Sequence, residues 1–138
     1  ALPIFAYASI AMTAPYLELI EEMTALECIH FHHGFKKLTI SGPELLSTVG
    51  LEKAGQKQIR YFSSGMKQRL KLGMACFSES PVLLLDEPLT NLDASGIHLY
   101  HELMKRVDHA KTIIISSNDP QEYSFCKDII DITRFAGT

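Results

Sequence analysis

The residues best suited to chemistry are two adjacent carboxylates, Asp86 and Glu87, which directly follow the aliphatic run from Val82 to Leu85. Such a run predicts a strand buried on both faces, and open parallel sheets bind ligands at the carboxyl ends of their strands. One acid placed there can hold Mg²⁺ during nucleotide hydrolysis, while the other orients or deprotonates the attacking water. The alternative is a structural role only, in which an apolar strand ends in two acids at a surface turn.

A second candidate is the run from Phe62 to Met66, which precedes a segment of helical character. Serines and a glycine at the start of a helix present a hydroxyl group, backbone N–H groups and the positive end of the helix dipole, and these bind anions such as phosphate. The alternative is an ordinary serine N-cap. The basic side chains of Lys67, Arg69 and Lys71 either add positive potential near this position or form a solvated helix face.

These two motifs, in this order, resemble those of the ABC ATPase family, and the resemblance covers nearly the whole chain. Phe62 to Met66 stands where the family has its Leu-Ser-Gly-Gly-Gln signature. Ser63 and Gly65 match that motif, whereas Ser64 replaces a glycine and Met66 replaces the glutamine. The resemblance implies that Ser63, Ser64, Gly65 and Met66 contact nucleotide.

The same resemblance implies roles for the acids. The run from Val82 to Glu87 stands at the family's Walker B strand, which implies that Asp86 is the magnesium-associated acid and Glu87 the catalytic carboxylate. The segment from Leu89 to Asp93 matches the D-loop, and its closing Leu-Asp pair is intact. ATP and Mg²⁺ are therefore the ligands expected for the intact protein.

Three departures from the family pattern bear on activity. The phosphate-binding loop, GxxxxGKS or GxxxxGKT, does not occur in the chain. This loop supplies the main grip on the β- and γ-phosphates, and we expect it in a segment upstream of Ala1. Pro15, beside Ala14, stands where the family has its Q-loop glutamine, and neither side chain can coordinate a metal.

The third departure is Asn118, which stands in place of the family's switch histidine. An asparagine can donate a hydrogen bond to a γ-phosphate, but it cannot carry a proton or a positive charge. We therefore expect slower hydrolysis, or dependence on a more competent partner subunit.

The elements that must position these residues form an α/β fold. Helical and extended segments alternate after Ser63, which predicts a parallel sheet. The resemblance implies the C-terminal part of a P-loop NTPase-like, mostly parallel sheet with a small α-helical signature subdomain. Residues 1–16 are expected to hold a core strand and the Q-loop region, residues 17–77 the helical subdomain ending in the signature helix, and residues 78–138 the core with the Walker B strand, D-loop and switch region.

Local patterns define the first elements. The apolar run from Ile4 to Thr13 predicts a strand that ends before Pro15, because proline lacks the N–H of a central strand. Thr24 and Glu27 match a capping box, which predicts a helix from Ala25 to His33, ended by Gly34. A second short helix is predicted from Pro43 to Val49.

Two further strands are predicted beyond the Walker B strand, at Thr112 to Ser116 and at Ile129 to Thr133. The helix before the first of these has apolar residues at helical spacing, which predict one buried face. They are Ile97, Tyr100, Met104 and Val107.

Composition excludes some classes of function. The chain has 13 basic and 16 acidic residues and a net charge of -3, so it lacks the basic surface that neutralises a nucleic-acid backbone. Its three cysteines have no zinc-ligand spacing and fit a reducing compartment. The apolar opening from Ala1 to Ala14 is too short to cross a bilayer, which takes roughly 20 apolar residues.

The resemblance implies an ATP-binding and ATP-hydrolysing subunit of an ABC transporter. Such a subunit forms a head-to-tail pair with a second ABC ATPase subunit and drives transmembrane subunits through its helical subdomain. It would be cytoplasmic and bound to the inner face of the membrane through these partners, and the chain alone is expected to be inactive. Two alternatives stay open, a non-transport ABC ATPase and a regulatory or scaffold protein with a degenerate site.

Overall fold

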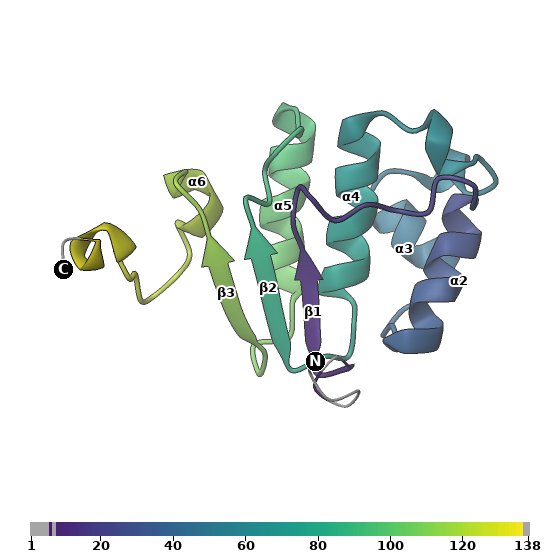
Figure 1. Cartoon of the computed structure of the whole chain (residues 1–138). Helices are drawn as coiled ribbons and strands as arrows, with labels where there is room; N and C mark the ends of the chain where they lie inside the picture. The colour runs from purple at the N-terminus through teal and green to yellow at the C-terminus, as the bar shows by residue number, and fades with distance from the viewer. Residues whose placement is uncertain (1–5, 7, 137–138) are drawn as a thin grey trace.

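The computed structural model describes Ala6 and residues 8–136 of the chain, and its centre is a sheet of three parallel strands. In the order of the sheet these are β1 (Ile10–Thr13), β2 (Val82–Asp86) and β3 (Thr112–Ser116). The strands start level with one another, because Val82 pairs with Ile10 on one side and with Thr112 on the other. All three carboxyl ends therefore meet at one edge (Figure 1). This arrangement confirms the predicted α/β class with a parallel sheet.

Two helices cover one face of the sheet. These are α4 (Ser64–Cys76) and α5 (Ala94–Arg106), which lie behind the strands in Figure 1. Along β2, Leu83 and Leu85 are fully buried, whereas the alternate residues are only half-buried. The expectation that β2 is buried on both faces is therefore wrong for the part of the chain that the structure describes, because helices pack on one side only.

The predicted apolar face of α5 is confirmed. Tyr100 and Met104 are buried, Val107 at the end of the helix is buried, and Ile97 packs partly against the core. No helix in the described residues is long and apolar enough to cross a membrane.

The helical part lies to one side of the sheet (Figure 1) and contains α2 (Ala25–Phe35), α3 (Gly42–Thr48) and two short 3-10 turns, Glu52–Ala54 and Ile59–Tyr61.

The start of α2 has the predicted capping box. The Thr24 N–H donates to Glu27 Oε2 at 2.8 Å, and the Glu27 N–H donates to Thr24 Oγ1 at 3.2 Å. Helix α2 continues through Gly34 to Phe35, and its C-cap is Lys36, so the predicted end at His33, before Gly34, is two residues too early. Helix α3 has Ser41 as its N-cap and includes the predicted proline in its first turn.

The strand predicted at Ile129 to Thr133 is wrong. Residues 129–131 have no regular structure, and the segment then enters the 3-10 turn Ile132–Phe135, which follows the short helix α6 (Pro120–Tyr123). The isoleucines are 69%, 79% and 77% exposed at positions 129, 130 and 132. The segment pairs with no neighbouring strand among the described residues. The Thr133 N–H instead donates to the side chain of Asp131 at 3.0 Å.

The strand predicted from Ile4 to Thr13 is shorter than expected. Only Ile10–Thr13 pairs with β2, and Ala6 and Ala8 are helical. Residues 4, 5 and 7 of that run lie outside the described residues.

Helix α4 approaches α3 closely at Gly73. A Cβ atom at this position would lie 2.7 Å from Val49 Cγ1 and 3.0 Å from Leu45 Cδ2. Both neighbours are fully buried, so they have little room to move. Glycine is therefore required here by packing.

We predict that Gly73→Ala destabilises the protein by about 1–2 kcal/mol, because overpacking outweighs the gain in helix propensity. The matched control is Gly34→Ala, also in a helix, where a Cβ would meet nothing within 4 Å. That control should stabilise the fold by about 0.5–1 kcal/mol. Urea unfolding of both variants tests the prediction, and shifts of the same sign would contradict it.

Candidate functional site

The two acids lie at the carboxyl end of the central strand. Asp86, the last residue of β2, pairs in register with Ser116, the last residue of β3. The Glu87 N–H donates to the Ser116 carbonyl oxygen at 3.0 Å, which extends the pairing by one residue. Asp86 is half-buried and Glu87 is exposed, so both carboxylates can reach a ligand at this edge.

Asn118 lies at the same edge, because it follows β3 by two residues. The local backbone is held by Ser117, whose Oγ accepts the Asp119 N–H at 2.8 Å. Asp119 is the N-cap of α6, and its Oδ1 accepts the Gln121 N–H at 2.9 Å. The side chain of Asn118 is exposed, so it can donate to a ligand held beside the acids.

The turn after β2, residues 87–93, has an unusual backbone. Glu87 has a φ of 43° and Asn91 a φ of 66°, and neither is a glycine. A left-handed conformation costs an ordinary residue roughly 1–2 kcal/mol. The turn offsets part of this cost with hydrogen bonds from the Thr90 N–H to the Glu87 carbonyl oxygen and from the Leu92 N–H to the Leu89 carbonyl oxygen, each 3.1 Å. The backbone at Glu87 is thus strained, a feature that is common at functional sites.

Side chains from two other elements hold this turn. From α4, Gln68 Nε2 donates to the Pro88 carbonyl oxygen at 2.8 Å, and Gln68 is only 1% exposed. From α6, Glu122 Oε1 accepts the Leu89 N–H at 2.8 Å. The turn therefore has buried partners on both sides.

The end of the turn is fixed by Asp93, the N-cap of α5. Its Oδ1 accepts the Gly96 N–H at 2.8 Å, and Arg69 Nη2 donates to the same oxygen at 3.2 Å and to Ser95 Oγ at 2.6 Å. The bond from Gly96, with a smaller effect of Arg69, lowers the pKa of Asp93, so this carboxylate stays ionised at neutral pH.

The signature residues form the start of α4. Ser63 is the N-cap, and its Oγ accepts the Met66 N–H at 3.1 Å. The N–H groups in the first turn of a helix have no backbone acceptor within the helix, so, apart from that of Met66, they are available to an anion. A Cβ on Gly65 would lie 3.0 Å from the Asn91 carbonyl oxygen, so glycine allows the helix start to approach the 87–93 turn.

The other basic residues of α4 have specific partners, which neither sequence-based alternative anticipated. Lys67 Nζ pairs with Glu21 Oε1 at 2.6 Å. Lys71 Nζ donates to the carbonyl oxygens of Ala14 and Leu17, each at 3.1 Å, and burial lowers its pKa. Lys71 thus connects α4 to the turn that contains Pro15, the position of the expected glutamine.

The donor set suits Mg²⁺ only in part. Mg²⁺ is typically held by one or two carboxylates together with phosphate oxygens and water, and Asp86 and Glu87 fit that pattern. The described residues contain no group of three or more His, Cys, Asp or Glu side chains that could hold a metal alone. A metal at this edge would therefore need the phosphates of a nucleotide as further ligands.

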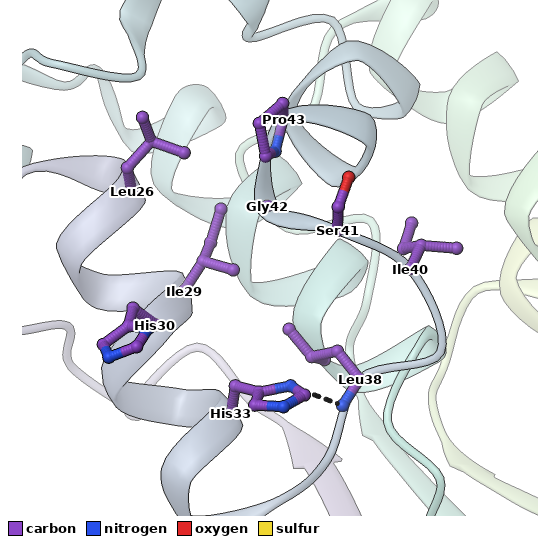
Figure 2. Close-up of a pocket in the computed structure, with 9 residues that line it drawn as sticks. All are labelled: Leu26, Ile29, His30, His33, Leu38, Ile40, Ser41, Gly42 and Pro43. Atoms are coloured by element: carbon purple, nitrogen blue, oxygen red, sulfur yellow. Dashed lines mark hydrogen bonds between the residues drawn. The ribbon is translucent and has the colours of Figure 1, made fainter.

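A pocket occurs elsewhere, between α2 and α3. Figure 2 shows its lining, which is mainly apolar and includes Leu26, Ile29 and Pro43. His33 lies at its margin, where its Nδ1 accepts the Leu38 N–H at 3.1 Å. This pocket belongs to the helical part, and none of the candidate site residues lines it.

Comparison with known proteins decides the family. A family model described as ABC transporter matches residues 8–90, which is more than half of the chain. The chain belongs to the ABC transporter family. It is 31% identical over 117 residues to an uncharacterized ABC transporter ATP-binding protein of Bacillus subtilis, covering 83% of this chain and 54% of that protein. It is 30% identical over 118 residues to the lipoprotein-releasing system ATP-binding protein LolD of Protochlamydia amoebophila, covering 78% and 52%.

Solved structures agree with this assignment in fold. The ATP-binding subunit of an ABC transporter matches with a TM-score of 0.77 and 25% identity, over 89% of this chain and 54% of that one. A dimeric ATP-binding cassette bound to ADP and Pi matches with a TM-score of 0.75 and 22% identity, over 88% and 57%, and supports the fold alone. The chain thus spans about half the length of the ABC ATPases named here.

Sequence reasoning missed Gln68 and Glu122. Gln68 stands on the helix that begins with the signature, where a polar residue predicts a solvated face, yet it is buried. Glu122 lies in a four-residue helix whose sequence gives no sign of burial. Their partners are backbone atoms of the 87–93 turn, and a sequence pattern does not report such contacts.

We predict that Gln68→Leu destabilises the protein by about 1–3 kcal/mol, because it leaves the buried Pro88 carbonyl oxygen without its donor. The matched control is Gln58→Leu, which removes an exposed bond of Gln58 Nε2 to the Glu22 carbonyl oxygen at 2.9 Å. The control should change stability by less than about 0.5 kcal/mol. If chemical denaturation gave equal losses of unfolding free energy for the two variants, the buried Gln68 bond would contribute no more to stability than the exposed Gln58 bond.

Proposed function

We propose that this chain is the part of an ABC transporter ATPase subunit that carries the acids of hydrolysis and the signature helix. The observation that supports this most is the placement of Asp86 and Glu87 at the carboxyl end of the central strand, beside the segment that carries Asn118. Parallel α/β sheets bind ligands at that edge. Membership of the ABC transporter family makes ATP the expected ligand.

Each residue has a distinct role in this proposal. Asp86 would hold Mg²⁺, and the ion would supply positive charge that neutralises the transferred phosphoryl group. Glu87 is exposed at the same edge and orients or deprotonates the attacking water. Asn118 donates a hydrogen bond to the γ-phosphate.

The signature residues act on a second nucleotide. Ser63, Ser64, Gly65 and Met66 form the start of α4, whose N–H groups suit a γ-phosphate bound by another ABC ATPase subunit in a head-to-tail pair. Asp93 lies at the base of the D-loop and is linked to α4 through Arg69. Closure of the pair would then move transmembrane subunits through the helical subdomain of residues 17–77, which comprises the helical part and α4. Contact with those subunits would hold the chain at the cytoplasmic face of the membrane.

We predict that the 138-residue chain alone binds Mg-ATP only weakly, because no GxxxxGKS or GxxxxGKT sequence is present to hold the β- and γ-phosphates. Isothermal titration calorimetry of the chain with Mg-ATP measures this directly. A micromolar dissociation constant, which corresponds to about -8 kcal/mol, would contradict the prediction.

In the full-length protein, Glu87→Gln should reduce the hydrolysis rate by a factor on the order of 10² to 10⁴, the usual contribution of a positioned general base. Nucleotide affinity should stay nearly unchanged, because the amide has the same shape and removes a charge that repels the triphosphate. Trapped ATP should then favour the paired form in size-exclusion chromatography. Unchanged turnover would remove Glu87 from the catalytic role.

The matched variant is Asp86→Asn, which changes the neighbouring carboxylate in the same way. It should weaken magnesium-dependent nucleotide binding as well as turnover, because Asp86 is assigned to the metal. If both variants affected only turnover, the division of roles between the two acids would be wrong.

A further inference from the structure

Glu122 is a buried carboxylate to which the proposed mechanism assigns no role. It is 4% exposed, and burying an acid is costly unless the group is hydrogen-bonded. Its Oε1 accepts the Leu89 N–H at 2.8 Å, across 33 positions of sequence. Its backbone carbonyl oxygen accepts the Tyr100 hydroxyl at 2.6 Å.

The first bond joins the turn that follows the acids to the segment that carries Asn118, and the second attaches that segment to α5. Leu89 lies in the strained 87–93 turn, two residues after Glu87. Glu122 lies in α6, four residues after Asn118. Burial raises the pKa of Tyr100, so its hydroxyl stays protonated and keeps donating to α6.

We propose that Glu122 is a positioning residue that fixes the distance between Glu87 and Asn118. This inference rests on the proposed ATPase function, in which those two side chains act on the same phosphate and its attacking water. Among the described residues, the one other hydrogen bond between the two segments runs from the Glu87 N–H to the Ser116 carbonyl oxygen at the end of the sheet. Without the Glu122 carboxylate, the Leu89 N–H would lose its acceptor, and the turn could relax away from its left-handed conformation.

An apolar residue at position 122 could fill the same space, but it could not accept the Leu89 N–H. A glutamine could, because its amide oxygen has the same place and the same acceptor capacity. The pair Glu122→Gln and Glu122→Ala therefore separates the acceptor function from packing. Glu102, whose carboxylate pairs with Lys105 on the surface of α5, provides a matched control as Glu102→Ala.

The experiment uses the full-length protein. In Glu122→Ala, kcat for ATP hydrolysis should fall roughly ten- to hundredfold, because a small misplacement of catalytic groups is costly, while KM for ATP stays within about twofold. Glu122→Gln should retain kcat within about threefold, and Glu102→Ala should match the wild type. Wild-type kcat in Glu122→Ala, or equal losses in the Gln and Ala variants, would overturn the proposal.

A second measurement does not depend on activity. Hydrogen–deuterium exchange at the Leu89 amide should be at least about tenfold faster in Glu122→Ala than in the wild type, and unchanged in Glu102→Ala. If Glu122→Ala does not fold, Tyr100→Phe replaces it, since loss of the hydroxyl should also raise exchange in residues 87–93. Unchanged exchange in residues 87–93 would overturn the proposal that Glu122 holds this turn. A wild-type protein that shows the link but no ATPase activity would overturn the proposed function instead.

Discussion

The candidate site depends on the shape of one turn, residues 87–93, which joins the central strand to α5. This turn contains two non-glycine residues in the left-handed region, Glu87 and Asn91, and such a backbone persists only where its surroundings impose it. Here the surroundings are the buried amide of Gln68 and the buried carboxylate of Glu122, which bond its backbone from opposite sides. The orientation of Glu87 is therefore set by α4 and α6 as well as by the sheet.

Helix α4 connects this turn with the rest of the chain through the geometry of a helix. Residues 67 and 71 are one turn apart and share a face, so both reach the connection that follows β1. Gln68 and Arg69 instead bond with the 87–93 turn, and Arg69 also bonds with the start of α5. Helix α4 thus contacts both the connection after β1 and the 87–93 turn, which follow neighbouring strands at the edge of the sheet. A shift of α4 would therefore move both segments.

The sequence predicted the elements whose signals are local. The capping box at Thr24, the apolar face around Tyr100 and the parallel β2 and β3 strands all depend on residues close together in the chain. The predicted strand at Ile129 fails because an aliphatic run becomes a strand only beside a partner, and β3 has none on that side within the described residues. Roles for the site residues came from family resemblance, whereas the buried bonds that position them join residues far apart in sequence.

The departure at Pro15 shows how contacts of another kind can hold a segment in place. Proline has no side-chain donor or acceptor, so it cannot link the β1–α2 connection to anything through its own side chain. Lys71 instead reaches from α4 to the backbone carbonyl oxygens of Ala14 and Leu17, on either side of that residue. Because these acceptors belong to the backbone, the link between the connection and α4 does not depend on which side chain occupies position 15. The position of this segment is therefore set by α4, the same helix that holds the 87–93 turn.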